Sequence, residues 1–293
     1  MSKEPLISVI VCVKNGMPYL PKALESLPAQ TYKNFEVIVQ DGGSDDGSLE
    51  ILQAFKDVPL NIVSKNDAGV GQAYNRAVAR CHGDIVGSLD ADNLLEPDAL
   101  LMAVETLHKH PEAAAIYGSV QMIDANGTPA YKYEPTPFDL FHLLSCELVP
   151  PFSTSFYSTR VCGSELRFDE SLKTCADLDL WTRIGHLPIV SVQQVLGRTR
   201  ISGKSMTQRP EHYEQFCADK IRILSRYLER FEAGGLRESL RNHAIAGVYL
   251  WAAKSLQYMA DGSGLSQEFL EKARSIMPQS PRLRELEMRL GGV

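Results

Sequence analysis

Short apolar runs rich in β-branched residues alternate with segments of helical periodicity over the first 125 residues. Four runs have the length and character of buried strands, namely 6–13, 35–40, 60–64 and 85–89. In other segments apolar side chains recur three or four positions apart, namely 18–27, 49–55, 70–80 and a segment that starts at Pro97. Such alternation is typical of a parallel sheet covered by helices, so this part is predicted to be βαβαβαβ.

The pattern changes after about residue 114 and again after about residue 211. Asn126-Gly127 predicts a hairpin turn, and a proline-rich stretch follows it, which together indicate antiparallel strands. The remaining chain has helical periodicity, in segments 212–231, 236–259, 266–276 and 281–290. We therefore expect an α/β domain over 1–210, with halves 1–125 and 126–210, followed by a helical extension over 211–293.

The composition excludes several classes of protein. With 44% hydrophobic and 23% charged residues, the chain is neither disordered nor a coiled coil. Thirty Lys and Arg against 36 Asp and Glu give a net charge of −6, which lacks the basic footprint of a nucleic-acid-binding protein. No nucleic-acid partner is expected. None of the six cysteines forms a Cys-x-x-Cys pair, so they are interpreted as reduced core residues.

Targeting features indicate a cytoplasmic protein. Residues 1–5 run directly into a strand-like segment without a signal peptide. The longest apolar run, 244–253, has ten residues, whereas about 20 are needed to cross a bilayer. An amphipathic segment carries Arg222, Arg226 and Arg230 as a basic stripe, which is either a solvated face or a weak peripheral contact with a membrane. Neighbouring acidic residues dilute this charge and favour the solvated face.

Two carboxylates, Asp90 and Asp92, flank Ala91 directly after the apolar run 85–89. At the end of a strand both can turn toward one hard cation, for which oxygen ligands indicate Mg²⁺ or Mn²⁺. Such ions usually take substrate phosphates among their remaining ligands, so a nucleoside diphosphate fits this motif. The alternative is that both residues belong to a turn that caps the helix after Pro97.

Two further polar loops follow strand-like runs. Asp41-Gly42-Gly43-Ser44 offers glycines for close approach of a ligand and a carboxylate aimed into the crevice, where a base or ribose could dock. Alternatively it is a turn that caps the next helix.

The segment from Asp67 to Asn75 opens a helix, whose free N–H groups can bind an anion. Tyr74 stands where a dinucleotide-binding motif has its third glycine, which disfavours a dehydrogenase.

A last candidate is Asp177 in the segment Asp177-Leu178-Asp179-Leu180-Trp181. A carboxylate held beside Trp181 could serve as a general base. The alternative is a helix N-cap, in which Asp177 only accepts hydrogen bonds from backbone N–H groups.

The order of these motifs along the chain resembles that of the family 2 glycosyltransferases with a GT-A fold. The resemblance covers about residues 6–207 and leaves the helical tail outside. It implies a Rossmann-like, mostly parallel nucleotide-binding sheet over 1–125 and a small antiparallel acceptor region over 126–210. It also implies inverting transfer of a sugar from a nucleoside-diphosphate sugar, by default a UDP-sugar, to a hydroxyl of a glycan or lipid-linked saccharide. The setting would be polysaccharide or glycolipid synthesis in the cytoplasm or at the inner face of the membrane.

The resemblance assigns a role to each candidate residue. The donor-binding residues it implies are Val13, Asn15, Asp41, Asp67, Asn75, Asp90, Ala91, Asp92 and Arg200. Asp92 would bind the metal, Mg²⁺ or Mn²⁺, directly, and Asp90 would lie near ribose and metal. Asp177 would be the catalytic base, and Trp181 and Arg183 on the same helix would position the acceptor or the base. Arg200, Ser205 and Thr207 resemble a mobile loop that closes over the donor diphosphate.

Three positions depart from the family pattern. Tyr74 stands where an Arg often precedes the Asn, so that one phosphate contact is either missing or supplied by Lys65 or Arg76. Ala176 replaces a frequent acidic residue before the base. Ser202 stands where a His is frequent, which leaves a third protein ligand to the metal without a candidate. The three required carboxylates are present, so we expect an active hexosyltransferase.

Two other functions stay open. A nucleotidyltransferase would also need a carboxylate pair and a metal, but it normally has a glycine-rich basic loop after the first strand. Here that stretch, 14–18, has one Gly and one Lys. The other alternative is a non-catalytic nucleotide-binding scaffold whose helical tail recruits partners.

Overall fold

The computed structural model describes residues 4–201, 206–257, 259 and 262–291. By backbone contacts the chain divides into two compact units. The first comprises Met1–Phe138, Pro150–Ser171 and Ile184–Ile201. The second comprises Asp139–Val149, Leu172–Arg183 and Ser202–Val293.

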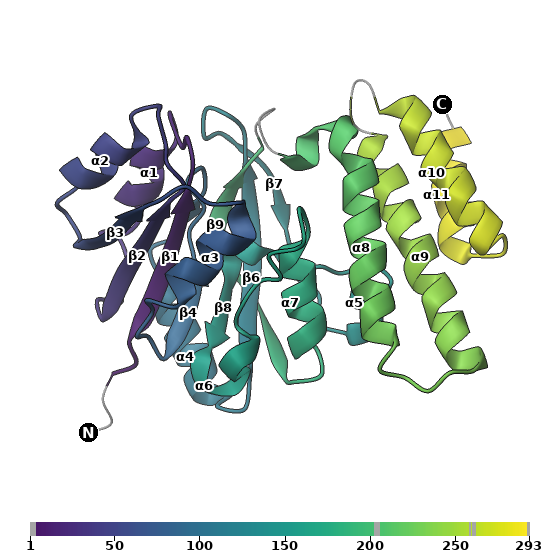
Figure 1. Ribbon diagram of the computed structural model, residues 1–293, viewed down its shortest axis with the longest axis horizontal. Coiled ribbons are helices and arrows are strands. Elements are labelled where there is room, and N and C mark those ends of the chain that lie inside the picture. Colours follow the sequence, from purple (N-terminus) through teal and green to yellow (C-terminus); the bar gives the residue numbers. More distant parts are fainter. Residues whose placement is uncertain (1–3, 202–205, 258, 260–261, 292–293) are drawn as a thin grey trace. The chain divides into compact units, whose positions relative to one another are not determined.

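A twisted sheet of mixed direction forms the centre of the first unit (Figure 1). Its first four strands, in the order β3-β2-β1-β4, are parallel. Their bounds are β1 Ile7–Val13, β2 Phe35–Asp41, β3 Leu60–Ser64 and β4 Ile85–Ser88. All four strands and their parallel arrangement were predicted from the apolar runs, and both are confirmed.

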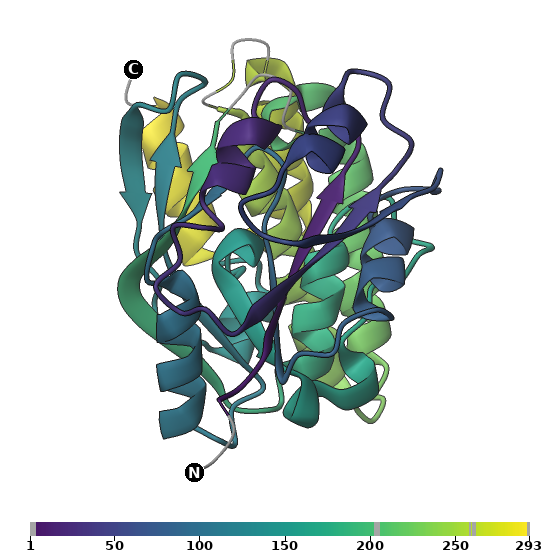
Figure 2. The same cartoon turned by 90° about the vertical axis from the view of Figure 1, so that its left-hand side faces the viewer.

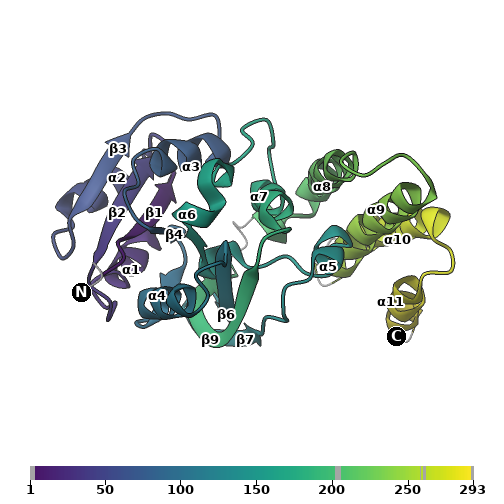
Figure 3. The ribbon, with the colours of Figure 1, turned by 90° about the horizontal axis from the view of Figure 1, so that it is seen from below.

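Helices cover both faces of these strands. The helices are α1 Leu20–Glu25, α2 Ser48–Ala54, α3 Val70–Val78 and α4 Ala99–Lys109. The odd-numbered residues of β1 pack in one core with Leu24, Leu52 and Leu100 of α1, α2 and α4, because side chains alternate between the faces of a strand. Helices α1 and α2 lie side by side (Figure 2). Helix α3 packs on the opposite face from α1 and α4 (Figure 3).

The sheet continues as β4-β8-β6-β9-β5, with β7 paired to β6. These strands are β5 Leu94–Leu95, β6 Ala115–Ile123, β7 Pro129–Tyr133, β8 Ser155–Ser158 and β9 Ile189–Arg200. The hairpin predicted at Asn126-Gly127 joins β6 to β7, and Gly127 has the positive φ of +91° that favours glycine there. The long pairing of β6 with β9 is parallel, which the hairpin signals did not predict. Two short helices, α5 Leu140–Leu144 and α6 Thr159–Cys162, accompany this part of the chain.

The second unit is helical. Its long helices are α8 Tyr213–Leu228, α9 Gly235–Leu256, α10 Ser263–Ile276 and α11 Pro281–Gly291, as the helical periodicity predicted. They share one apolar core, which includes Leu224, Val248 and Phe269. In the described part of the chain, no helix combines the length and the apolar character needed to cross a membrane.

The second unit also takes in segments that precede the predicted domain boundary at residue 210. Helix α5 and most of α7, Ala176–Ile184, belong to it. Leu144 and Cys146 are part of the same core as α8 and α9. Gly247 of α9 lies so close to α5 that a Cβ there would sit 2.1 Å from the Ser145 carbonyl oxygen. The functional division into 1–210 and 211–293 stays a prediction.

Candidate active site

The loops singled out by sequence meet at one edge of the parallel sheet. Val13, Asp41 and Ser64 are aligned neighbours at the carboxyl ends of β1, β2 and β3, and β4 ends beside β1. A Cβ on Gly16 would lie 3.1 Å from the Ala91 Cβ, and one on Gly42 would lie 2.6 Å from an Asp67 carboxylate oxygen. The structure therefore brings the loops after all four strands together, at the edge where ligands bind open α/β sheets.

Asp41 is fully buried and organises the loop that follows β2. Its carboxylate accepts hydrogen bonds from the Gly43 and Ser44 N–H groups and from the hydroxyls of Ser44 and Ser64. The Val13 carbonyl accepts a further bond from Gly42 N at 2.8 Å. Both carboxylate oxygens of Asp41 are engaged within the protein, and its predicted contact with the nucleotide stays a prediction.

A set of hydrogen bonds, here called the loop clasp, joins the loop after β1 to the loop after β2. Asn15 has a φ of +56°, its Oδ1 accepts from Asp45 N at 3.0 Å, and its own N–H donates to Ser44 Oγ at 2.9 Å. Met17 N donates to Asp46 Oδ2 at 2.9 Å. Burial acts to raise the pKa of Asp46, but hydrogen bonds from Ser48 and Met17 outweigh it and hold this pKa below its usual value.

The roles of Ser44 and Asp46 in the clasp were missed in the sequence. The available signal was the density of Asp and Ser in 41–48, because such side chains readily bond to nearby backbone groups.

Asp67 lies just before α3, and Asn75 lies within this helix. Asp67 Oδ1 accepts a hydrogen bond from Gly69 N at 3.0 Å, just before α3 begins. Asn75 pins α3 to a distant segment, since its Nδ2 donates to the Phe168 carbonyl and to Glu170, and its Oδ1 accepts from Phe168 N. Both ends of the Asn75 amide are thus occupied, and its place in a nucleotide pocket stays a prediction.

Tyr74 contributes to the core instead of to the site surface. Its ring is 2% exposed and stacks on Phe168 with 4.1 Å between ring centroids. Burial is the main cause that raises the pKa of its hydroxyl. The buried Tyr74 side chain is therefore not available for a phosphate contact at the site surface. Arg76, one expected substitute, donates to the Asn66 carbonyl at 2.9 Å.

Asp90 and Asn93 form a compact turn after β4. Asp90 Oδ2 accepts from Asn93 Nδ2 at 2.8 Å, and its carbonyl accepts from Asn93 N at 3.1 Å. Asp90 and Asp92 do not cap the helix after Pro97, as the alternative interpretation held, because β5 lies between them and α4 and the N-cap of α4 is Asp98.

Arg200 braces this turn from β9. It is 5% exposed, its Nε donates to the Asp92 carbonyl at 3.1 Å, and its Nη1 donates to the carbonyls of Asp124 and Ala125. Its guanidinium also lies 4.4 Å from the centroid of the Tyr19 ring. The predicted contact of Arg200 with the diphosphate stays a prediction. Ser202 and Ser205 lie outside the described residues, and Thr207 is exposed on a short turn, Met206–Gln208.

Asp92 is a half-buried carboxylate to which no other described side chain or backbone N–H donates a hydrogen bond. Burial raises its pKa, and its own backbone N–H and the charge of Arg200 offset this only in part. Asp90 and Asp67 lie close enough to Cys12 that, after burial, they are the main causes that raise the pKa of this thiol to about 12. Negative charge therefore gathers at the end of β1, which suits a divalent cation.

A metal ion would find few protein ligands at this edge. Across the residues whose placement is described, no three His, Cys, Asp or Glu side chains are grouped to hold a metal. The oxygen chemistry of Asp90 and Asp92 fits Mg²⁺ or Mn²⁺ if phosphate and water complete the coordination.

Asp177 lies in the second unit, in the first turn of α7. It is half-buried, and within the described chain its carboxylate makes no hydrogen bond, so it does not act as the N-cap that the alternative interpretation required. Trp181, one turn later, is fully buried. Arg183 donates its Nε to Asp179 at 2.9 Å, and its predicted role in positioning base or acceptor stays a prediction.

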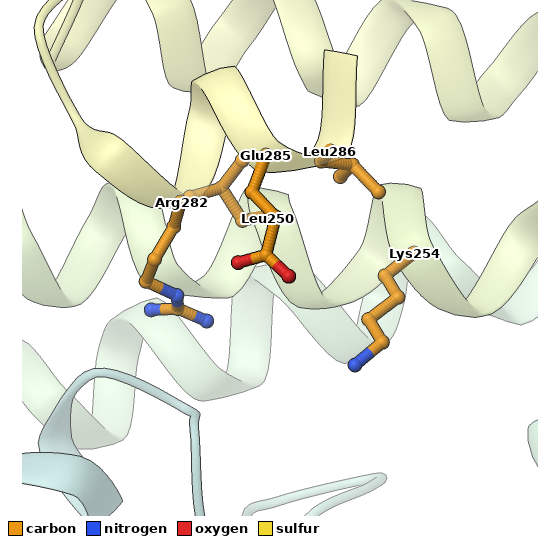
Figure 4. A pocket seen from close by; sticks show the side chains of 5 residues that line it. All are labelled: Leu250, Lys254, Arg282, Glu285 and Leu286. Atoms are coloured by element: carbon orange, nitrogen blue, oxygen red, sulfur yellow. The ribbon is translucent and has the colours of Figure 1, made fainter. Parts of the chain in front are cut away.

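A small hollow in the second unit lies between α9 and α11 and is lined by Leu250, Lys254, Arg282, Glu285 and Leu286 (Figure 4). Its volume of about 90 Å³ is well below that of a nucleotide-sized pocket, roughly 300 Å³ or more. Arg282 is already paired with Glu147 and with the Ser145 carbonyl.

A family model described as glycosyl transferase family 2 matches residues 8–160, more than half of the 293 residues. The chain belongs to this family. The matched segment includes all four strand-end loops and stops before α7, so this glycosyl transferase carries its candidate base outside the matched part.

Known proteins of similar sequence are polysaccharide synthases and glycosyltransferases. Chondroitin synthase of Escherichia coli is 27% identical over 231 residues, which cover 73% of this chain and 32% of the synthase. The chain spans about a third of the length of the first curated relatives it matches.

Solved structures of low identity share the fold. S. aureus TarS 1–349 in complex with UDP-GlcNAc has a TM-score of 0.63 at 18% identity, over 97% of this chain and 92% of that chain. The mannosyltransferase PcManGT from Pyrobaculum calidifontis, in complex with GDP-Man and Mn²⁺, has a TM-score of 0.61 at 19% identity, over 96% and 83%. The predicted GT-A fold is thereby confirmed.

Proposed function

We propose that this glycosyl transferase moves a sugar from a nucleoside-diphosphate sugar to a hydroxyl of a glycan or a lipid-linked saccharide, with inversion of configuration. The observation that carries the proposal is the meeting of four strand-end loops around Asp90 and Asp92, within the segment that matches the family. A UDP-sugar is the preferred donor, supported by the complex of TarS with UDP-GlcNAc, a protein that shares the fold.

The donor site is proposed at the carboxyl edge of β1 to β4. Val13, Asn15, Asp41, Asp67 and Asn75 would surround the nucleoside. The loop clasp would fix the two loops on which this pocket depends, and the buried Arg200 would hold the Asp90–Asn93 turn toward the diphosphate.

Asp92 and Asp90 would hold one Mg²⁺ or Mn²⁺ ion. When bound, the ion would stabilise the negative charge of the leaving nucleoside diphosphate. The complex of the mannosyltransferase PcManGT with GDP-Man and Mn²⁺ supports such use of a divalent cation. The pKa of the half-buried Asp92 stays raised although the charge of Arg200 partly offsets burial, so this carboxylate is suited to a cation that adds further positive charge.

Asp177 is proposed as the general base. It would accept the proton of the acceptor hydroxyl while that oxygen forms a bond to the anomeric carbon and the bond from this carbon to the diphosphate breaks. Attack from the face opposite the leaving group inverts the configuration. The absence of hydrogen bonds to the Asp177 carboxylate from described residues leaves it available for this proton.

Replacement of Asp177 by Asn tests this function. We expect transfer from a UDP-sugar to fall at least about 100-fold, since a positioned base contributes about that much, while UDP binding stays unchanged. Asp57→Asn, at an exposed loop position, is the matched control and should retain activity. Full transfer by Asp177→Asn would overturn the assignment, and nucleotide binding by a wild type without transferase activity would favour the scaffold alternative.

A cytoplasmic enzyme with weak contact to the inner membrane face also belongs to the proposal. The basic stripe predicted for α8 is partly used inside the protein, since Arg226 pairs with Asp179 and Arg230 packs 5.3 Å from the centroid of the Tyr227 ring. Any membrane attraction through this stripe would therefore be small.

A further inference from the structure

Helix α7 has only nine residues, and two buried carboxylates tie it to α8. The two helices lie side by side (Figure 1). Helices this short are marginal by themselves, so their position depends on tertiary contacts. The placement of Asp177 in the first turn of α7 must therefore come from those contacts.

The first tie holds the segment that leads into α7. Asp219 of α8 is 5% exposed, and its Oδ2 accepts hydrogen bonds from both the N–H and the hydroxyl of Thr174, each at 2.9 Å. The next residue, Cys175, turns the chain with a φ of +57° into the helix. Asp219 thus fixes the backbone three residues before Asp177.

The second tie holds α7 two residues beyond Asp177. Asp179 is 2% exposed and accepts from Arg183 on its own helix and from Arg226 of α8. Asp219 and Arg226 are seven positions apart and therefore lie on one face of α8. One face of a single tail helix thus contacts the chain on both sides of the candidate base, at Thr174 just before α7 and at Asp179 within it.

Lys220 of α8, next to Asp219, packs against α9. This side chain is 4% exposed, and its Nζ lies 4.2 Å from the centroid of the Trp251 ring of α9. Burial acts to lower the pKa of Lys220, but Cys146, Cys175 and Asp177 outweigh it and raise the pKa above its usual value. The charges of Lys220 and Asp177 therefore attract each other.

We infer that α8 is a positioning element for catalysis, with Asp219 and Arg226 as positioning residues that hold α7 and thereby aim the Asp177 carboxylate. The inference rests on the proposed role of Asp177 as base. It gives the tail, which lies outside the family match, a part in the reaction. Buried charged groups cost stability unless they are paired, and the pairs formed here by Asp179 and Asp219 hold α7 in position.

The test compares Arg226→Ala with Arg274→Ala. Both arginine side chains are 46% exposed, and each pairs with an acidic residue of another helix, Arg226 with Asp179 of α7 and Arg274 with Glu287 of α11. The assay is release of nucleoside diphosphate from a panel of UDP-, GDP- and dTDP-sugars with Mn²⁺, with water and with a panel of saccharides as acceptors, together with UDP calorimetry and thermal melts.

We expect Arg226→Ala to lower kcat about 10- to 100-fold, because small misplacement of a catalytic group has effects of this size, while KM and UDP affinity stay within about twofold of the wild type. Arg274→Ala should retain the wild-type kcat. Asp219→Ala should behave like Arg226→Ala, and Asp219→Asn, which keeps an acceptor for Thr174, should recover part of the lost rate. If Asp219→Ala does not fold, Arg226→Ala decides alone.

A wild-type kcat in folded Arg226→Ala, or an equal loss in Arg274→Ala, overturns the positioning role. Asp177→Asn in the same assay separates this failure from failure of the proposed function. If Asp177→Asn is inactive and Arg226→Ala is normal, only the positioning role fails. If the wild type releases no nucleoside diphosphate, or Asp177→Asn is as fast as the wild type, the proposed function fails and the positioning role fails with it.

Discussion

At the scale of single residues, the carboxylates of this protein fall into two groups with different chemistry. Asp41 and Asp46 accept several hydrogen bonds and shape loops. Asp92 and Asp177 are half-buried and receive no hydrogen bond from another described residue. A partly desolvated carboxylate without hydrogen-bond donors costs stability, so such residues indicate function more strongly than satisfied ones.

Asp92→Asn is expected to stabilise the protein without metal while it removes metal-dependent nucleotide binding. Because burial raises the folded-state pKa of Asp92, its ionised form is disfavoured in the fold, and this cost is present at neutral pH and absent in acid below the ordinary Asp pKa. We expect the melting temperature at pH 7.5 to rise by about 1–3 °C in EDTA. Asp57→Asn should change it little, and a lower melting temperature for Asp92→Asn would contradict this account.

How far the site could be predicted depends on which contacts are local. The positions of Asp41, Asp67, Asp90 and Asp92 at strand ends follow from apolar runs that can be recognised in the sequence. The partners of Asn75 and Arg200 could not be predicted, because Asn75 bonds to Phe168 and Arg200 bonds to Asp124, far away in the chain. The loops of the candidate site could thus be predicted from the sequence, whereas the structure shows which side chains hydrogen-bond within the protein to hold these loops.

At the scale of elements, the same distinction explains the fold. The four parallel strands, their helices and the tail helices have local periodicity and were predicted within a few residues of their bounds. The parallel pairing of β6 with β9 and the inclusion of 139–149 and 172–183 in the helical unit depend on contacts between distant segments. No local pattern encodes these contacts.

The loop clasp gives an element-scale prediction with a defined pH dependence. Asp46→Ala should lower the melting temperature, because it frees Met17 N and Ser48 N from their acceptor. The folded-state pKa of Asp46 is below its ordinary value of 3.8, so the stabilisation is complete above that value and is lost as the pH falls through the lower folded-state pKa. The difference between wild type and variant should be constant from about pH 5 to pH 8 and shrink toward pH 3. A difference that grows in acid would contradict the clasp.

Helix packing in the second unit gives another prediction. Gly247→Ala would place a Cβ 2.1 Å from the Ser145 carbonyl oxygen, and since this neighbour is backbone, α9 or α5 must move. We expect a loss of about 1–3 kcal/mol in the free energy of unfolding, typical of overpacking. Gly264→Ala in α10, where a Cβ meets nothing within 4 Å, should be neutral or stabilising. Equal denaturation midpoints for the two variants would contradict the close approach.

At the scale of the whole molecule, charge is unevenly distributed. Residues 1–210 carry 18 basic and 25 acidic residues, a net charge of −7, whereas 211–293 carry 12 and 11, a net charge of +1, which together give the total of −6. An acidic part of the chain would need a local countercharge to bind an anionic nucleoside diphosphate as proposed, and Asp67 and Asp90 already gather near Cys12 at the site edge. Donor binding should therefore depend strongly on a divalent cation.

The most direct test of this account is calorimetric titration of UDP into the wild type and into Asp92→Ala, each with Mn²⁺ and with EDTA, with GDP and dTDP as comparison ligands. We predict that the wild type binds one of these nucleotides only with Mn²⁺ and that Asp92→Ala loses this binding while its thermal melt shows a folded protein. Equal binding in EDTA, or undiminished Mn²⁺-dependent binding by Asp92→Ala, would contradict the proposed donor site at the carboxyl edge of the sheet.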